Sequence, residues 1–196
     1  MKKIYTAIAA LSLATSVMAQ IPVMHIELND GSVQTFKIAD IREMTFGEEE
    51  EPSLAEKIAG EYTGANTMAV GTLATYTVQI KPVITANEDG SVNFTYPQYE
   101  VPETLMGNLT LGTLTISDIP YVESENAFYL DYSDAGLQQH FTCVTPQGTT
   151  SMDSDYVLGA GSTIRIEITG GGIKVSNPFK LGSMPFPLTA TFEGSK

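Results

Sequence analysis

Short runs of alternating apolar and polar residues fill most of the chain after residue 75. Clear examples are residues 76–80, 92–96, 128–132, 164–168 and 188–192. A period of two places one face of a strand in a core and the other in solvent, as in antiparallel sheets. Turn-forming residues at 87–90, 133–136 and 170–172 separate the runs, a spacing typical of sandwiches and barrels. We therefore predict an all-β domain of eight to ten short strands over residues 54–196.

A separate, smaller pattern precedes this domain. Met24, Ile26 and Leu28 alternate with polar residues, Asn-Asp-Gly follows at 29–31, and Phe36 and Ile38 alternate again. Asn-Asp-Gly favours a tight turn, so residues 20–46 are predicted to form a β-hairpin segment. A lone hairpin is marginal in water, so it must dock, pair with another chain or stay loosely ordered. Residues 47–53 contain four consecutive glutamates and a proline, which predicts an acidic linker.

The first nineteen residues have the pattern of a secretory signal peptide. Lys2 and Lys3 precede an apolar run at 4–17, and Val-Met-Ala at 17–19 forms a plausible cleavage site. The run is too short to span a bilayer comfortably, and no cysteine follows the site for lipid attachment. The sequence thus predicts an exported protein, periplasmic or extracellular, that is not a lipoprotein and has no transmembrane segment.

The amino-acid composition of the chain limits the kinds of molecule that it can bind. The chain of 196 residues has 10 Lys and Arg against 23 Asp and Glu, a net charge of −13. Nucleic acid is a poor partner for such a chain, because phosphate binding needs a basic stripe. The single cysteine, Cys143, excludes an internal disulfide and a cysteine-based metal site. Nothing in the sequence calls for a cofactor.

Both ends of the main domain carry a family resemblance. Gly-Glu-Tyr-Thr-Gly opens it at 60–64, and Pro-Phe-Pro at 185–187 leads into its last strand. Together with the signal peptide and the leading hairpin, this resembles the calycin-like, or lipocalin-like, β-barrel family of exported Gram-negative bacterial proteins. The resemblance implies an up-and-down barrel of about eight strands with a generally undefined small-molecule site. Lipocalins proper carry Trp near the start of strand one, where this chain has Tyr62, and Arg165 would be the late-strand arginine that stacks on it.

The interior of such a barrel is the candidate site. A barrel of eight strands is either filled by side chains or holds one small ligand. An open cavity with apolar walls would suit an apolar or amphipathic guest, and the pattern alone does not distinguish lining from filling. The ligand-binding candidates from the barrel interior are Tyr62, Tyr76, Val78, Phe94, Tyr96, Phe128, Leu130, Arg165 and Phe192.

The sequence offers little support for catalysis or a metal. No Gly-x-Ser-x-Gly elbow is present, and His140 and Cys143 are three residues apart, so on a strand they face opposite sides. No two of the acids stand out as a glycosidase pair. Asp153 and Asp155 flank Ser154 but lack the glycine and glutamate of a calcium loop, so a solvated turn is expected there. We expect no enzyme and no metal site.

Two functions follow. The first is an exported, non-catalytic β-barrel module that binds a small apolar or amphipathic ligand. The alternative is a cell-envelope interaction or inhibitor module with a side-chain-filled barrel. In the alternative, the free strand edges of the N-terminal hairpin would add to the sheet of a protein partner.

Overall fold

The computed structural model describes residues 21–44, 51–182 and 186–196. They fall into two units, which divide between residues 50 and 51. The predicted signal peptide at 1–19 and most of the predicted linker lie outside the described residues. No helix in these ranges is long and apolar enough to cross a membrane.

The first unit is the predicted hairpin. β1 (Val23–Glu27) pairs antiparallel with β2 (Val33–Lys37), and a short 3-10 helix (Ile38–Asp40) follows. Gly31 has a φ of +83°, as the tight turn between the strands requires. This element is confirmed, and several of its apolar side chains are exposed, among them Val33 and Phe36.

The second unit begins with a single short helix, α1 (Leu54–Ile58). Ser53 accepts a hydrogen bond from the backbone of Glu56, whose side chain in turn accepts one from the Ser53 backbone. This capping box satisfies two N–H groups at the helix start that would otherwise lack partners. Ala55 and Ile58 are buried, so the helix packs onto the barrel.

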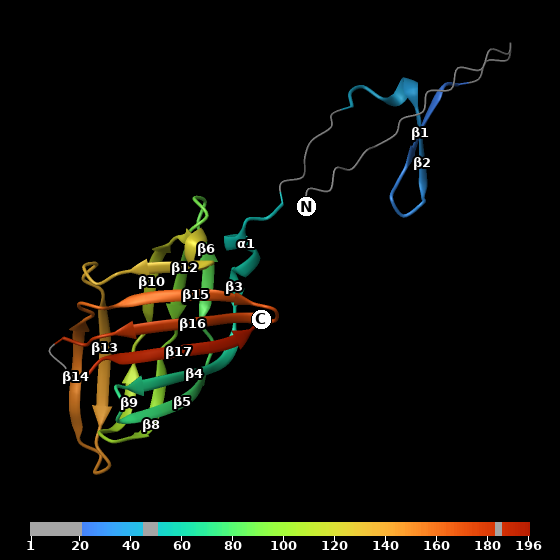
Figure 1. Cartoon of the computed structure of the whole chain (residues 1–196). Coiled ribbons are helices and arrows are strands. Elements are labelled where there is room, and N and C mark those ends of the chain that lie inside the picture. The colour runs from blue at the N-terminus through green and yellow to red at the C-terminus, as the bar shows by residue number, and fades with distance from the viewer. Residues whose placement is uncertain (1–20, 45–50, 183–185) are drawn as a thin grey trace. The chain divides into compact units, whose positions relative to one another are not determined.

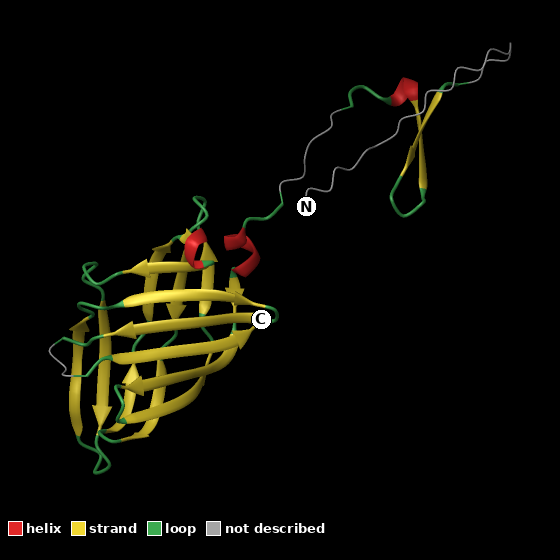
Figure 2. Cartoon of the chain, viewed as in Figure 1, coloured by secondary structure: helices red, strands yellow, loops and turns green. Residues whose placement is uncertain are grey.

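The rest of the unit consists almost entirely of antiparallel strands (Figures 1 and 2). A 3-10 turn (Glu123–Glu125) interrupts them. The strands are β3 (Gly60–Glu61), β4 (Thr63–Val70), β5 (Ala74–Ile80), β6 (Val83–Ala86), β7 (Val92–Tyr96), β8 (Tyr99–Thr104), β9 (Gly107–Leu111), β10 (Leu114–Ile119), β11 (Tyr121–Val122), β12 (Ala127–Asp131), β13 (Gln138–Val144), β14 (Thr150–Val157), β15 (Thr163–Thr169), β16 (Gly172–Phe179) and β17 (Leu188–Ser195).

Pairing of the last strand with an early one closes the domain. β17 pairs with β4 from Leu188 opposite Val70 to Ser195 opposite Thr63, within a sheet ordered β11-β12-β15-β16-β17-β4-β5 (Figure 1). The other two sheets of this unit are ordered β10-β7-β6-β3 and β14-β13-β9-β8. Pro82 and Pro97 stand where the chain passes from one sheet to another, because proline cannot donate to a strand ladder. The predicted all-β, antiparallel architecture is confirmed, although the described residues of this unit form fifteen strands, more than the eight to ten that the alternation predicts.

The glycine that ends the opening motif has a packing role. A Cβ atom at Gly64 would overlap the carbonyl oxygen of Glu193 on β17. Only glycine lets the two backbones approach this closely. Gly64 is thus required by the pairing that closes the barrel.

The strand register aligns inward side chains into rows across the barrel wall. We call one the pocket row: Asn177, Ala190, Met68 and Tyr76. The adjacent inner row contains Val175, Phe192, Asn66 and Val78. The pocket row contributes Met68 and Tyr76 to the lining of an apolar pocket.

Candidate ligand-binding pocket

An apolar pocket of about 290 Å³ lies at the end of the barrel where β4 turns into β5. Met68, Val70, Ala74 and Tyr76 from this strand pair form one wall. Met68 and Tyr76 belong to the pocket row, and Val70 and Ala74 form the next pair toward the turn. Since residues two apart on a strand share a face, the alternation of these strands brings all four side chains into the pocket.

The turn between β8 and β9 forms a second wall. Thr104, Leu105, Met106 and Leu109 line the pocket there. The backbone N–H of Leu105 donates a hydrogen bond of 3.0 Å to the Tyr76 hydroxyl. This bond joins the two walls and uses the one hydroxyl of the β4–β5 side, so the remaining lining is almost wholly apolar.

Five further side chains complete the pocket. They are Phe141 of β13, Met152 of β14, Leu181 after β16, Phe186 before β17, and Leu188 at the start of β17. The three methionines of the lining, Met68, Met106 and Met152, are unbranched and flexible, so they adapt to guests of different shape. A volume near 300 Å³ is at the lower end of the range for small-molecule sites.

Apolar side chains also surround the mouth. Leu73, Leu105, Met106 and Phe186 are exposed, and Leu105 exposes 80% of its surface. A group of large apolar side chains in water is unfavourable unless something covers it, so such a patch commonly marks a binding surface. A second hollow of about 320 Å³, at the other end of β4 and β17, is more open, and its lining includes three glycines and the charged residues Lys174 and Glu193.

A buried polar cluster lies inside the barrel beside the pocket. We define it as Asn66, Tyr96, Tyr99, Tyr132 and Asn177. Asn177 Nδ2 donates 2.6 Å to the Tyr132 hydroxyl and 2.7 Å to the Thr163 carbonyl. The Asn177 Oδ1, the Tyr96 hydroxyl and both amide atoms of Asn66 are buried without a hydrogen-bond partner. An unpaired buried polar group costs about 1–3 kcal/mol, so this cluster lowers the stability of the protein as it stands.

Burial keeps the tyrosines of this cluster neutral. It raises the pKa of Tyr132 to about 12, although the hydrogen bond from Asn177 acts in the opposite direction. The pKa of Tyr96 is raised well above its ordinary value, first by burial and then by the nearby Tyr99 and Tyr132. Burial also raises the pKa of Tyr99, while the nearby Asn66 lowers it, even though Asn66 makes no hydrogen bond of ordinary geometry. The cluster therefore offers uncharged donors and acceptors only.

Of the interior candidates predicted from the sequence, Tyr76 lines the pocket. Val78 and Leu130 are partly buried against the core, and five more are packed within it. Those fully packed residues are Tyr62, Phe94, Tyr96, Phe128 and Phe192. The structure thus shows both outcomes, a filled barrel over most of its length and a cavity at one end.

Arg165 is a correction, because its side chain does not face the interior. Ile164 and Ile166 point into the core, so the residue between them points outward. The Arg165 guanidinium pairs with Glu167 through Nε at 2.7 Å and with Glu125 through its terminal nitrogens, and these two carboxylates raise its pKa. The cation over the Tyr62 ring is Lys196, with Nζ 5.6 Å from the ring centroid.

Sequence reasoning missed most of the pocket. Met68 belongs to a run in which Asn66, Met68 and Val70 alternate, and this signal could have been read. Leu105 and Met106 form an apolar pair in a tight turn before Gly107, which is unusual for a solvated turn. Met152 and Leu181 come from distant segments, and only the fold brings them to the pocket.

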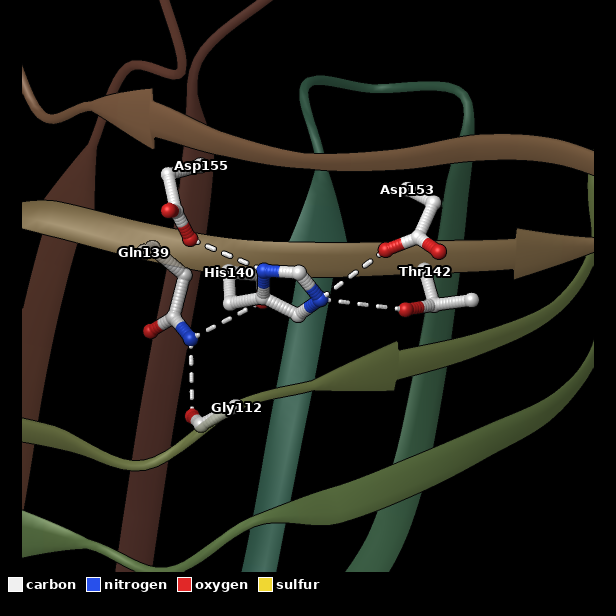
Figure 3. Close-up of polar contacts among 6 residues, drawn as sticks. All are labelled: Gly112, Gln139, His140, Thr142, Asp153 and Asp155. Carbon is white, nitrogen blue, oxygen red and sulfur yellow. Dashed lines mark hydrogen bonds and ion pairs between the residues drawn. The ribbon is translucent and has the colours of Figure 1, made fainter.

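A polar cluster on the outer face of β13 and β14 is the remaining candidate (Figure 3). The His140 ring lies between two carboxylates, with Nδ1 2.8 Å from Asp155 Oδ1 and Nε2 3.2 Å from Asp153 Oδ1. Both aspartates belong to β14, so the expectation of a turn there is wrong. Asp155 is the cross-strand partner of His140, and Asp153 is the cross-strand partner of Thr142. All three ionisable side chains are about half exposed or more, and no group of three His, Cys, Asp or Glu in the described residues could hold a metal.

Comparisons with known proteins agree with this architecture. A family model described as "Calycin-like beta-barrel domain" matches residues 58–195. One solved structure, of a "putative outer membrane protein" from Bacteroides fragilis, aligns with 92% of this chain and 71% of its own at 14% identity and a TM-score of 0.47. No curated protein matches. Because the family match covers most of the chain, the protein belongs to the calycin-like β-barrel domain family.

Proposed function

We propose that this protein is an exported, non-catalytic barrel that binds one small apolar or amphipathic molecule in the pocket bounded by Met68, Tyr76 and Leu109. The observation that carries the proposal is the apolar pocket itself, open to solvent at the end of an otherwise packed barrel. A calycin-like barrel is generally a binding fold, which agrees with this function. Export follows from the predicted signal peptide at residues 1–19.

The energetic argument for a ligand is simple. Each square ångström of apolar surface removed from water contributes roughly 25 cal/mol to binding. The pocket and the exposed side chains at its mouth, such as Leu73 and Leu105, supply that surface. An apolar guest would therefore gain free energy by entering, whereas a polar one would lose its hydration against walls that give few hydrogen bonds.

The proposal is tested by titrating the exported chain, residues 20–196, with the uncharged fluorescent probe N-phenyl-1-naphthylamine. We expect a saturable enhancement with one site per chain. Ala74→Trp fills the pocket from its wall and should abolish binding. Thr75→Trp adds the same ring at the next residue, on the exposed outer face of β5, and should leave binding unchanged.

Two results would contradict the proposal. One is the absence of saturable binding by the unmodified chain. The other is an equal loss in both tryptophan variants, because it would place the probe elsewhere on the barrel.

A second candidate function rests on the N-terminal hairpin. β1 and β2 form a two-stranded sheet whose outer edges have no strand partner within the described residues, and Val23, Val33 and Phe36 are exposed. Such an edge can add to the sheet of another protein. Removing residues 20–46 should then abolish crosslinking to an envelope protein while probe binding by the barrel is retained, and unchanged crosslinking would argue against this role.

A further inference from the structure

The polar cluster borders the pocket through the strand register. Asn177 lies in the pocket row with Met68 and Tyr76, both of which line the pocket. Asn66 lies two residues before Met68 in the chain, on the same inward face of β4 and one row further from the mouth. Tyr99 is joined to the pocket by the adjacent sheet, where Leu111 pairs with both Tyr99 and the lining residue Phe141. Unpartnered polar atoms are thus found next to the deep end of an apolar cavity.

These unpartnered atoms have the chemistry of a recognition site. The Asn66 amide presents two N–H donors and a carbonyl acceptor, and neither its nitrogen nor its oxygen has a partner. The side-chain oxygen of Asn177, Oδ1, adds an acceptor, and the Tyr96 hydroxyl adds a donor. Buried polar groups in folded proteins are normally paired, so a set of unpaired groups beside one cavity indicates a partner that is bound there.

The same residues exclude a charged partner. The buried polar residues of the described chain are asparagine, glutamine and serine, with no Lys, Arg, His, Asp or Glu among them. An ionised carboxylate or ammonium would lose its hydration here and meet no opposite charge. A hydroxyl, amide or ester group would instead exchange its hydrogen bonds with water for bonds to the cluster.

We propose that Asn66, Asn177 and Tyr96 recognise the uncharged, hydrogen-bonding head group of a single-chain ligand, an inference that rests on the proposed function. The chain of the ligand occupies the apolar pocket toward the mouth. One water molecule occupies ~30 Å³ in the liquid, and a methylene group is of similar size. A volume of 290 Å³ therefore holds about ten methylene groups. Met68 separates the pocket from Asn66 and, with three rotatable bonds, it can move aside for the head group.

The test compares ligands that share a ten-carbon chain and differ in their head group. Decan-1-ol, decanamide, decanoate and decylammonium are each titrated as competitors of N-phenyl-1-naphthylamine bound to the exported chain at neutral pH. We expect the two uncharged ligands to bind at least about tenfold more tightly than the two ions, because each ion loses its hydration and meets no opposite charge in the site. Decanamide, which matches both the donors and the acceptors, should bind most tightly.

One variant separates head-group recognition from chain binding. Asn66→Leu keeps a similar side-chain volume and removes both unpartnered amide atoms. We expect it to narrow the preference for decanamide over decan-1-ol to less than about twofold. Its melting temperature should be equal to that of the unmodified chain or higher.

The control is Gln139→Leu. Gln139 is also a buried amide that does not line the pocket, but its nitrogen is satisfied by the Gly112 carbonyl at 2.7 Å. This variant should melt at a lower temperature and keep the full head-group preference.

The outcomes distinguish the two proposals. If the probe binds and all four head groups bind alike, the head-group proposal is overturned and the proposed function stands; the cluster then holds water only. If neither the probe nor any ligand binds, both proposals fail. If Asn66→Leu does not fold, the ligand series on the unmodified chain decides, since it needs no variant.

Discussion

The Tyr76 hydroxyl accepts a hydrogen bond from the backbone N–H of Leu105, and this bond of 3.0 Å joins the two walls of the pocket. The residues are 29 positions apart, on β5 and in the turn after β8. The backbone at Leu105, the residue with the most exposed apolar side chain of the mouth, is therefore held from within the pocket. The β8–β9 turn would otherwise be held on this side by apolar contacts alone.

Tyr76→Phe tests this connection. The aromatic ring remains, but the Leu105 N–H loses its acceptor, so the turn should open more often. We expect faster hydrogen exchange at the Leu105 amide and a loss of about 0.5–1.5 kcal/mol in the free energy of unfolding, the usual net value of one hydrogen bond.

Tyr121→Phe is the matched control for that variant. Tyr121 donates 2.8 Å to Asn126 Oδ1 and does not line the pocket. Its loss should leave Leu105 exchange unchanged. Equal exchange at Leu105 in all three proteins would show that the bond to Tyr76 does not hold the turn.

Alkaline pH should destabilise the barrel through its buried tyrosines. The pKa of Tyr132 in the folded state is about 12, above its ordinary value of 10.0 in an unfolded chain. The folded state therefore binds more protons between these values, so the stabilisation is complete below pH 10 and is lost as the pH rises toward about 12. The raised pKa values of Tyr96 and Tyr99 act in the same direction.

Urea unfolding at several pH values measures this loss. The part due to Tyr132 is on the order of 3 kcal/mol, at 1.36 kcal/mol per pKa unit. Tyr132→Phe removes the titrating group, so its free energy of unfolding should fall less steeply above pH 10. At neutral pH the same variant should already be about 1–3 kcal/mol less stable, because Asn177 loses a buried partner. A stability that does not change between pH 10 and 12 would contradict the burial of these hydroxyls.

Arg165→Met tests the outward placement of Arg165. The variant removes the ion pairs with Glu125 and Glu167 on the barrel surface and keeps the aliphatic stem. We expect a small decrease in the urea midpoint that shrinks in high salt, as for other exposed ion pairs, and less than about a twofold change in probe affinity. A large loss of probe affinity with little loss of stability would instead indicate a direct role of Arg165 in binding.

Cys143 should report the stability of the barrel. Its thiol is fully buried on β13 and donates 3.3 Å to the Met106 carbonyl in the turn at the pocket mouth. Alkylation should therefore require unfolding and should be slow in buffer and fast in urea. N-phenyl-1-naphthylamine at about one hundred times its dissociation constant should slow alkylation roughly a hundredfold, since it stabilises the folded state by about 2.7 kcal/mol. Rapid alkylation in buffer would show that the β8–β9 turn opens without global unfolding.

The sequence by itself determined the local structure. Alternation with period two marked the strands, Asn-Asp-Gly marked the hairpin turn, and the Gly-x-Tyr-x-Gly opening indicated the family. These signals are readable because strand geometry and turn conformation depend on neighbouring residues. The outward direction of Arg165 was also present in its flanking isoleucines, where the resemblance to lipocalins suggested the opposite.

Only the tertiary structure decided where the barrel is filled and where it is hollow. Phe94, Phe128 and Phe192 alternate in the same way as Tyr76, yet they are packed and Tyr76 lines the pocket. The difference comes from the register of β17 against β4 and from the β8–β9 turn, which bring Met68 and Leu105 to one end of the barrel. Pairings between segments this far apart depend on how all strands close together, so alternation along any one strand does not reveal them.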